Sequence, residues 1–531
     1  MLEAEQLVLA VDLGTSGCKC ALVSLRGEVR AWAFRPVPLH VDGIGAEQDP
    51  RDWWRAFVGS ATELLGRDPT VRAQVRAVCC STQGEGTVAV DRTGAPLGRA
   101  LVWLDMRGAA AIARQAGGSL LQVAGYAPAK LWRWLRLTGG APALSGKDPA
   151  GHMCYLRDHE AARYEATYKV LNVLDYMNLR LTGRFCATGD SILTSWVTDN
   201  READRVRYDA RLIAMLGIDR DKLPELVNGT DVLGPLLPDV SQALGLSRAT
   251  PVVAGSIDNS AVAVGACAVR DYDTHLYLGT SSWLGAHVPR KKTDIHNKIA
   301  SVPCAVRGRY LAMAMQSAAG ANLSFLRDRV LFHKDELLRD EQKPDVYQVL
   351  DRIAERVPAG ARGLLYTPWL FGERTPVDDT CLRAGLLNLS LEHSREDIIR
   401  AFLEGVALNT RWMLEPFARF LEHRPDSITA VGGGAQSDVW CQIFADVTGT
   451  NVQQPEDAIQ ANAVGAAMIA NVGTGALRFD DIPGLRRVHR VYEPRLAQRR
   501  LYEDRFATFR EAQRRLAPMY RRINAPGAVA A

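Results

Sequence analysis

The sequence lacks several features that would assign a protein to a class at once. No apolar run approaches the ~18 residues that a membrane-spanning helix needs. There is no CxxC pair and no HxxxH spacing, so no pattern typical of a structural zinc site is present. Lys and Arg number 64 and Asp and Glu 60, which leaves a formal charge of +4. A charge so nearly balanced gives no support to a role in binding nucleic acid.

The cysteines and the start of the chain indicate a reducing compartment. The ten cysteines are scattered, and Cys79, Cys80, Cys267 and Cys441 lie in apolar runs. Cysteines that serve as small buried hydrophobic residues are typical of cytoplasmic proteins. The chain begins Met-Leu-Glu-Ala-Glu-Gln, without the basic start of a signal peptide, and reaches an apolar run at 7–11. We therefore expect a cytoplasmic protein with reduced thiols and no association with membranes.

An internal repeat indicates how the chain of 531 residues is divided. A domain typically holds ~100–200 residues, so at least two are expected. The sequence Leu-Gly-Thr-Ser occurs at 13–16 and again at 278–281, an offset of 279 − 14 = 265 residues, which is half the chain. Strand-like runs follow both copies, at 19–23 and 283–288. Each half is therefore predicted to carry a hairpin whose Gly-Thr-Ser tip could cradle phosphate oxygens, although Gly-Thr-Ser is also common turn chemistry.

Strand-like and helix-like patterns alternate beyond each hairpin, which predicts α/β layers in both halves. A domain boundary near residues 248–252 fits the repeat, with Pro251 beginning a new strand. The predicted elements are a helix over 50–65, strands over 75–81 and 87–91, a helix from about Ser394 to 421 that is interrupted at Pro416, a strand over 428–431 and a helix over 437–448.

Two acidic residues follow predicted strands. Asp12 lies beside the first Gly-Thr-Ser, where a phosphate would repel it unless a cation such as Mg²⁺ lay between them. The alternative is an Asp that stabilises the turn. Asp258 stands before the apolar segment 261–268, which is predicted to be a buried helix. It could cap that helix or serve as a general base toward a hydroxyl group, and the local sequence leaves both open.

Two further stretches could contact a ligand. Gly432-Gly433-Gly434 follows a predicted strand and opens a helix, so a ligand could approach the backbone there, although such glycines are often only structural. These glycines do not form the dinucleotide-binding pattern GxGxxG, and the chain has no Walker A motif. Residues 103–107, Trp-Leu-Asp-Met-Arg, could offer a ring, a carboxylate and a guanidinium to a polyol. They could equally form a salt bridge beside a core tryptophan.

The C-terminal stretch 486–522 holds twelve arginines and four acidic residues, a net 12 − 4 = +8. An acidic partner or nucleic acid could be attracted to it. Its aromatic and apolar residues recur near helical spacing, however, which favours a solvated helix docked by one face. Those residues are Tyr502, Phe506, Phe509, Leu516 and Tyr520.

Taken together, these motifs resemble the FGGY family of carbohydrate kinases, most closely its xylulokinase-like branch. The resemblance runs from about residue 7 to about residue 510, and the order and spacing of its motifs are specific although each motif is short. The motifs are VDLGTS at 11–16, AEQDP at 46–50 with Trp53 and Trp54, WLDMR at 103–107, GSIDN at 255–259, PWLFGERTP at 368–376, and GGGAQS at 432–437 with Trp440.

The resemblance implies an α/β fold of two ribonuclease-H-like domains, of the actin, hexokinase and Hsp70 type, with ATP in a central cleft. The expected units are 1–248, 249–510 and a C-terminal helix end and tail at 511–531. Carried over by motif, Asp12 would help to hold Mg²⁺ and Asp258 would be the catalytic base. The residues expected near the phosphates are Thr15, Ser16, Gly279 and Thr280. Those expected near the adenosine are Gly433, Gly434 and Ser437, and those near the sugar are Glu85, Trp103, Asp105, Asp258 and Asn259.

The sequence also departs from the family pattern. Residues 83–86, Gln-Gly-Glu-Gly, stand where xylulokinases usually have Met-His-Gly, and a Glu here is more like glycerol kinases. His152 and Tyr155 occupy the places of a Lys and a Trp in the family's first signature. The second signature is kept around 385–404, except that Asn388 replaces a glycine.

The resemblance implies ATP-dependent phosphorylation of a primary hydroxyl on a small ketose, with D-xylulose as the first expectation. Ribulose, glycerol and erythritol are alternative substrates. A catalytically silent regulator that binds sugar or nucleotide on the same fold is a further alternative, and an Hsp70-like ATPase is disfavoured because no peptide-binding domain follows the second half. The family also suggests a homodimer.

Overall fold

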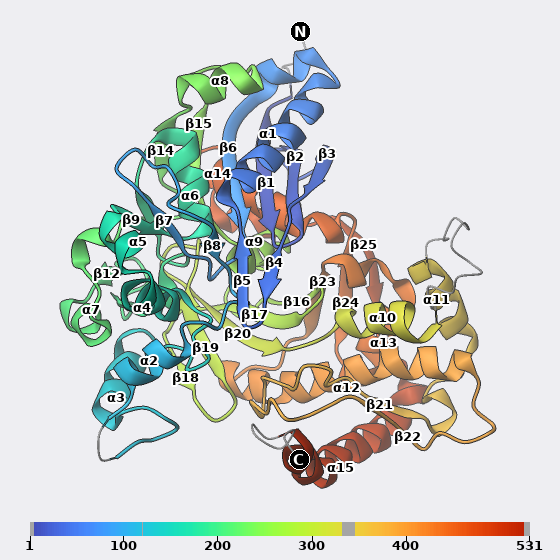
Figure 1. Ribbon diagram of the computed structural model, residues 1–531. Coiled ribbons are helices and arrows are strands. Elements are labelled where there is room, and N and C mark those ends of the chain that lie inside the picture. Colours follow the sequence, from blue (N-terminus) through green and yellow to red (C-terminus); the bar gives the residue numbers. More distant parts are fainter. Residues whose placement is uncertain (1–4, 119–120, 332–345, 525–531) are drawn as a thin grey trace, which may run out of the picture.

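The computed structural model describes residues 5–118, 121–331 and 346–524. Figure 1 shows two lobes, each built around one large sheet. Part of the predicted tail, residues 525–531, lies outside the described residues. Among the residues that are described, no helix combines the length and the apolar character needed to cross a bilayer.

The sheet of the first lobe has six strands in the order β14-β15-β6-β1-β2-β3. Strands β1, β2 and β3 form an antiparallel meander, β6 and β15 run parallel to β1, and β14 is antiparallel to β15. The strands are β1 (Leu7–Gly14), β2 (Gly17–Ser24), β3 (Val29–Pro36), β6 (Val75–Thr82), β14 (Val232–Pro235) and β15 (Pro251–Ile257).

The sheet of the second lobe repeats this arrangement. Its order β20-β17-β16-β23-β24-β25 matches β3-β2-β1-β6-β15-β14 in every strand direction, and β19 and β18 extend its edge. This match confirms the predicted duplication and the two-domain α/β fold. The strands are β16 (Thr274–Leu278), β17 (Ser282–Val288), β18 (Thr293–Asp294), β19 (Ile299–Pro303), β20 (Tyr310–Gln316), β23 (Ser427–Val431), β24 (Asn451–Pro455) and β25 (Val488–Tyr492).

The boundary predicted after residue 248 falls inside the first sheet. Strand β15 begins at Pro251 and pairs in parallel with β6, so the last parallel strand of the first lobe comes after that boundary. The repeat located equivalent hairpins, which lie near the start of each domain, and therefore did not mark where the first domain ends. The first lobe continues through α9 (Asp258–Gly265), and the second sheet starts at Thr274.

Two equivalent helices cross where the lobes join. Helix α14 (Ala461–Gly473) follows β24 as α9 follows β15, and Figure 1 shows it in orange against the blue strands of the first lobe. It packs on α9 and on one face of the first sheet. A Cβ on Gly265 would lie 1.9 Å from the carbonyl oxygen of Ala461, and one on Gly465 would lie 1.9 Å from that of Ala261. The two helices therefore touch backbone to backbone.

The longer helices agree with the sequence patterns except at one proline. Helix α1 (Pro50–Gly66) is capped by Asp49, and α13 (Asp438–Thr448) follows the predicted strand. Helix α12 (Arg395–Leu421) passes through Pro416 without the predicted interruption. A proline inside a helix costs ~3 kcal/mol. Because Pro416 is buried in the core of the second lobe, the packing of the surrounding helix offsets that cost.

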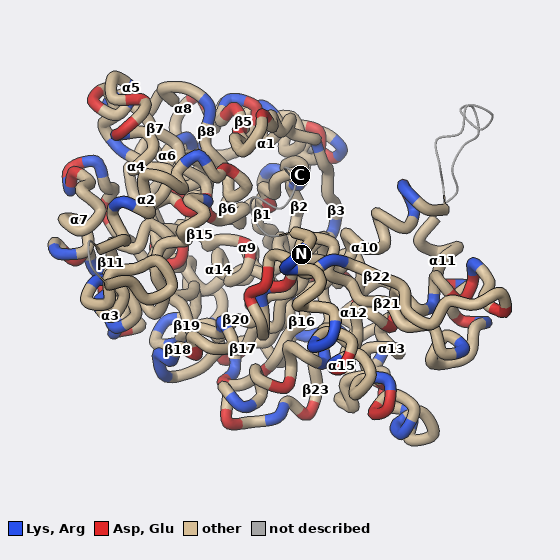
Figure 2. Tube along the Cα trace, turned by 60° about the horizontal axis from the view of Figure 1, so that its bottom comes forward, with Lys and Arg blue, Asp and Glu red and all other residues tan. Residues whose placement is uncertain are grey.

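The arginine-rich stretch 486–522 is not one helix: its first part contains β25, and the rest forms α15 (Arg499–Asn524), which docks in the second lobe by its aromatic residues, as predicted. Figure 2 shows charges of both signs mixed over the two lobes. The remaining helices and strands are α2 (Ala109–Ala116), α3 (Pro128–Leu137), α4 (Pro149–His159), α5 (Ala161–Ala166), α6 (Val173–Thr182), α7 (Ala210–Leu216), α8 (Pro238–Leu244), α10 (Gly320–Phe325), α11 (Val346–Arg356), β4 (His40–Asp42), β5 (Gly45–Gln48), β7 (Val88–Val90), β8 (Ala100–Leu101), β9 (Lys169–Leu171), β10 (Cys186–Thr188), β11 (Thr198–Asp199), β12 (Arg207–Tyr208), β13 (Glu225–Val227), β21 (Leu365–Thr367) and β22 (Gly385–Leu387).

Candidate active site

The carboxyl ends of three adjacent parallel strands bring the predicted acids to one edge of the first sheet. Strands β15, β6 and β1 are neighbours in that order, and Thr82 at the end of β6 pairs with both Leu13 and Ile257. Asp12 precedes Leu13, and Asp258 follows Ile257. Ligands of open α/β sheets bind beyond the carboxyl ends of the strands, so this edge is the expected place for a site.

Asp258 is the first residue of α9, and the capping position before it is held by an isoleucine that makes no side-chain cap bond. The carboxylate accepts the N–H of Asn259 at 2.8 Å. Burial raises the pKa of Asp258 to about 7, and the carboxylates of Asp12, Glu85 and Asp190 add to the rise, while the bond from Asn259 opposes it. A carboxylate with a pKa near neutrality is suited to accept a proton from a substrate.

Asp12 has neighbours from both lobes. Its carboxylate is 3.7 Å from Nζ of Lys19, and the side chain of Asn462, on the first turn of α14, lies near it. Burial raises the pKa of Asp12, whereas Lys19 and Asn462 lower it. Segments from both halves of the chain therefore meet at this acid.

The residues around Asp12 suit a magnesium ion. The amide oxygen of Asn462 is buried and has no partner among the described residues. Together with the carboxylate of Asp12, it offers the hard oxygen ligands that Mg²⁺ prefers. Within the described part of the chain, no group of three or more His, Cys, Asp or Glu could hold a metal alone. Mg²⁺ bound with a nucleotide usually takes one or two carboxylates, since phosphates and waters complete its shell.

Tyr277, on β16 of the second lobe, lies close to the same acids. It stacks on Trp283 with ring centroids 4.0 Å apart. Burial raises the pKa of Tyr277, and Asp12 and Asp258 raise it further. The two acids therefore lie together where the lobes meet, and not on opposite faces of the molecule.

Both predicted hairpin tips are present. Residues 15–16 connect β1 to β2, and residues 279–281 connect β16 to β17. The side chains of Ser16 and Thr280 are exposed at these tips. Gly320, at the start of α10, donates its N–H to the carbonyl of Gly279 at 2.8 Å and supports the second tip. Contact of the tips with phosphate stays a prediction.

The side chain of Thr15 is engaged inside the protein. Its hydroxyl donates to Oε1 of Gln83 at 2.7 Å and accepts Nε1–H of Trp103 at 3.0 Å. Gln83 in turn donates to Oε1 of Gln48 at 2.7 Å. Thr15 therefore connects the first tip to Trp103, and only its backbone is left to contact a phosphate.

Glu85 and Asn259 are predicted sugar residues whose side chains make no hydrogen bond to another described residue. Glu85 is half-buried and has a φ of +59°, a conformation uncommon outside glycine. Burial raises the pKa of Asp148 to about 7, and Glu85 adds to the rise, so Glu85 lies near both Asp148 and Asp258. Free polar groups at this edge could bind hydroxyl groups.

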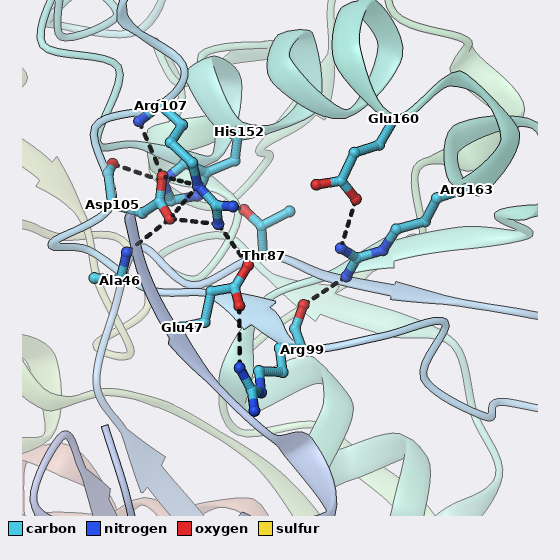
Figure 3. A network of polar contacts seen from close by, with 9 residues as sticks. All are labelled: Ala46, Glu47, Thr87, Arg99, Asp105, Arg107, His152, Glu160 and Arg163. Atoms are coloured by element: carbon cyan, nitrogen blue, oxygen red, sulfur yellow. Dashed lines mark hydrogen bonds and ion pairs between the residues drawn. The ribbon is translucent and has the colours of Figure 1, made fainter. Parts of the chain in front are cut away.

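Asp105 is placed differently from what the motif implies. It is 0% exposed, and its Oδ2 accepts the N–H of Ala46 at 2.9 Å and Nη2–H of Arg107 at 2.7 Å (Figure 3). Its Oδ1 accepts the backbone N–H of Arg107 at 3.0 Å. Arg107 also donates to Glu47 at 2.6 Å. Because both oxygens are used within the protein, direct contact of Asp105 with a sugar finds no support in this geometry; Asp105 shapes the turn that presents Trp103.

His152 supports the same turn (Figure 3). It is buried, and its two ring nitrogens lie 3.0 Å from the hydroxyl of Thr87 and 3.2 Å from the carbonyl oxygen of Asp105. A carbonyl can only accept, so Nε2 carries the proton and Nδ1 accepts from Thr87. Burial lowers the pKa of His152 to about 4, which keeps the ring neutral.

The glycines after β23 divide into structural and open positions. Gly432 has a φ of +95°, and a Cβ there would lie 2.7 Å from the carbonyl oxygen of Leu278. A Cβ on Gly434 would lie 2.8 Å from the ring of Trp440. Nothing lies within 4 Å of a Cβ on Gly433, so this is the position with room for a ligand.

The hydroxyl of Ser437 is already hydrogen-bonded within the protein. It accepts the N–H of Trp440 at 3.0 Å, which caps α13, and it donates to Asp351 at 2.7 Å. A nucleotide contact by this side chain would have to compete with both bonds. The predicted roles of Gly433, Gly434 and Ser437 near adenosine stay predictions.

Comparison with protein families agrees with this arrangement. Residues 7–265 match the N-terminal domain of the FGGY family of carbohydrate kinases, and residues 275–474 match its C-terminal domain. The chain belongs to the FGGY family. Members of this family are ATP-binding phosphotransferases that act on carbohydrates.

Relatives of this FGGY kinase include proteins named for two substrates. The chain is 29% identical to a xylulose kinase of Bacillus subtilis, with 88% of each chain covered. It is 25% identical to a gluconokinase of Bacillus licheniformis, covering 90% of this chain and 89% of that one. The crystal structure of a ligand-bound xylulose kinase from Lactobacillus acidophilus has the same fold, with a TM-score of 0.83, 22% identity, and coverage of 98% of this chain and 100% of that one.

Sequence reasoning missed three residues of this FGGY kinase's site. Lys19 pairs with Asp12 across the first hairpin, so the register of β1 and β2 could have located it. Gln48 lies in the AEQDP motif but gave no sign of its bonds to Thr15 and Gln83. Asn462 had no signal in the sequence, because only the packing of α14 brings it to Asp12.

Proposed function

We propose that this FGGY kinase transfers the terminal phosphoryl group of ATP to a primary hydroxyl of a small neutral ketose, with D-xylulose as the first substrate to test. The observation that carries the proposal is the place of Asp258, which starts α9 at the end of β15 with its pKa raised to about 7 by burial. Such a carboxylate can take the proton of an alcohol as its oxygen attacks phosphorus.

The sugar side of the mechanism follows from the groups around Asp258. Asp258 would accept the hydroxyl proton and aim the attacking oxygen. Glu85 and Asn259 have polar groups free to orient neighbouring hydroxyls, and the half-exposed ring of Trp103 offers an apolar surface for the carbon chain. Phosphoryl transfer depends mainly on such alignment, because little covalent work falls to the protein.

The phosphate side uses both lobes. The backbone of the two tips and the hydroxyls of Ser16 and Thr280 would donate hydrogen bonds to phosphate oxygens. Asp12 and Asn462 would hold Mg²⁺, which supplies positive charge to the phosphates when bound. Closure of the lobes about the crossing of α9 and α14 would bring the tips together and exclude water.

The charges at the site support a neutral substrate over gluconate. Asp258 has the carboxylates of Asp12 and Glu85 beside it. Two nearby cations already form ion pairs within the protein: Lys19 with Asp12, and Arg107 with Asp105 and Glu47. A substrate carboxylate would therefore be repelled, whereas hydroxyl groups can donate to these acids.

Glu85 supports a second candidate, a polyol such as glycerol or erythritol, because its free carboxylate can accept hydrogen bonds from two hydroxyls. A ketopentose such as ribulose would use the same groups. A catalytically silent regulator gains less support, because Asp12 and Asp258 are brought together in the arrangement that transfer needs.

The test is ADP release with ATP and Mg²⁺ across D-xylulose, D-ribulose, glycerol, erythritol and D-gluconate. We expect turnover with a neutral substrate and little with gluconate. Asp258→Asn should lower kcat by ~10²–10⁴-fold while ATP binding persists. The control is Asp239→Asn, on the exposed face of α8, which should retain full turnover. Near-normal turnover of Asp258→Asn would show that Asp258 is not the catalytic base. If none of the sugars in the panel causes ADP release, the silent regulator is favoured.

We also propose that the enzyme works in the cytoplasm and forms a homodimer, as the family suggests. The ten cysteines are free, and eight of them are buried, which fits a reducing compartment. Light scattering of the purified protein gives the oligomeric state, and a mass of one chain would contradict the dimer.

A further inference from the structure

The segment that leads into Asp258 is held by bonds from outside its own sheet. The ladder between β15 and β6 is irregular around Gly255, which has a φ of +76°. The N–H groups of Ala254 and Gly255 donate to carbonyls of the turn at 229–231, at 3.0 and 2.9 Å. The next such bond uses a side chain: the N–H of Ile257 donates to Oδ2 of Asp190 at 3.1 Å.

Asp190 belongs to a buried pair of acids. Asp190 and Asp175 are 4% and 0% exposed. The N–H of Ser191 donates to Oδ1 of Asp190 at 3.0 Å, and the hydroxyl of Ser191 donates to Asp175 at 2.7 Å. Asp175 also accepts the N–H of Asn172 at 2.9 Å at the start of α6. No Lys or Arg in the described ranges forms an ion pair with either acid.

A neutral amide could not replace the carboxylate of Asp190 in these bonds. A buried carboxylate with no cation beside it is costly, because hydrogen bonds replace only part of its hydration. Burial raises the pKa of Asp190 to about 6, which still leaves it mostly charged at neutral pH. The two oxygens of Asp190 each accept one N–H, from Ser191 and from Ile257, and an amide has only one oxygen, so a carboxylate is needed to hold both segments.

That charge acts on Asp258. Burial is the main cause of the raised pKa of Asp258, and the charged groups that add to it are Asp12 on β1, Glu85 after β6 and Asp190 after β10. From the second lobe, Tyr277 lies near Asp258 and is neutral, because burial raises its own pKa. Asp190 is thus bonded to the residue before Asp258 and lies near the Asp258 carboxylate itself.

We propose that Asp190 is a positioning residue for phosphoryl transfer: its Oδ2 accepts the N–H of Ile257 and so fixes the turn that aims Asp258. This inference rests on the proposed role of Asp258. It predicts that losing every acceptor at this position displaces Asp258, whereas keeping one oxygen for the N–H of Ile257 largely preserves its place.

Three variants separate these consequences. Asp190→Asn keeps one oxygen that can accept the N–H of Ile257 but gives up the bond from the N–H of Ser191, while Asp190→Ala removes both acceptors. Asp175→Asn is the matched control, an equally buried acid joined to Asp190 through Ser191 but bonded to no residue next to Asp258. Their kcat and the KM for ATP and sugar are measured from pH 5 to 9, with thermal unfolding as a check on folding.

We expect Asp190→Asn to lose only a small part of its activity, because the amide oxygen keeps the N–H of Ile257 while the bond from Ser191 is lost. Its kcat on the plateau should stay within about fivefold of the wild type. Asp190→Ala should lose ~10–100-fold in kcat with the KM for ATP unchanged, as expected when a catalytic group is displaced. Asp175→Asn should lower the unfolding midpoint without lowering kcat.

A loss of kcat in Asp175→Asn as large as or larger than that in Asp190→Asn would overturn the proposal. So would equal losses of kcat in Asp190→Asn and Asp190→Ala, which would make the residue merely structural. If Asp190→Ala does not fold, the comparison of the two Asn variants decides. Full turnover of Asp258→Asn would instead refute the proposed base, a result that involves no change at Asp190.

Discussion

Replacing Gly465 by alanine tests the backbone contact between α14 and α9. The new Cβ would lie 1.9 Å from the carbonyl oxygen of Ala261, and Cβ contacts under 3.0 Å essentially never occur, so the helices must separate by about 1 Å. Overpacking of this kind costs ~1–3 kcal/mol. Alanine inside a helix is more favourable than glycine by ~1 kcal/mol, which offsets part of this cost. We expect a net loss of up to ~2 kcal/mol in the free energy of unfolding, and a loss of turnover because the crossing sets how the lobes face each other.

Thermal unfolding and ADP release measure the two effects. A loss of 1 kcal/mol lowers the unfolding midpoint by roughly 2–4 °C for a domain of this size. The control is Gly66→Ala at the end of α1, where nothing lies within 4 Å of the added Cβ, and its midpoint should stay equal or rise. If Gly465→Ala were as stable and as active as the wild type, the contact would not be tight and the reasoning would fail.

Three further predictions follow from the site. Since burial raises the pKa of Asp258 to about 7, kcat/KM should fall about tenfold per pH unit below pH 7 as this base becomes protonated, and a profile flat to pH 5 would contradict it. Asp105→Ala should lower the free energy of unfolding by ~2–3 kcal/mol, because it leaves the N–H of Ala46 and the guanidinium of Arg107 short of partners. It should raise the KM for sugar but not for ATP. An equal rise in both KM values would argue against a role confined to the turn that carries Trp103. Ser437→Ala should cost ~1 kcal/mol through the lost cap of α13 and leave the KM for ATP within about twofold, whereas a tenfold rise would reveal direct contact with the nucleotide.

The structure departs from sequence-based expectation at points that depend on packing. The repeat at 13–16 and 278–281 found equivalent hairpins, but it could not show that β15 belongs to the first sheet. Pro416 signals a break in any exposed helix, yet it is tolerated in α12 because that helix is buried in the core of the second lobe. A pattern in the chain reports local preference, and the core decides whether that preference prevails.

By itself, the sequence determined the hairpins, the tips and the acids at strand ends, because each of these depends on a short run of neighbouring residues with its own period and turn chemistry. Only the tertiary structure decided what each polar group binds. Asp105 is hydrogen-bonded to Ala46 and Arg107, and Thr15 is hydrogen-bonded to Gln83 and Trp103. Asn462 comes close to Asp12 from the other half of the chain. The partners of a buried side chain are set by segments that fold against it from far along the chain, so no local pattern encodes them.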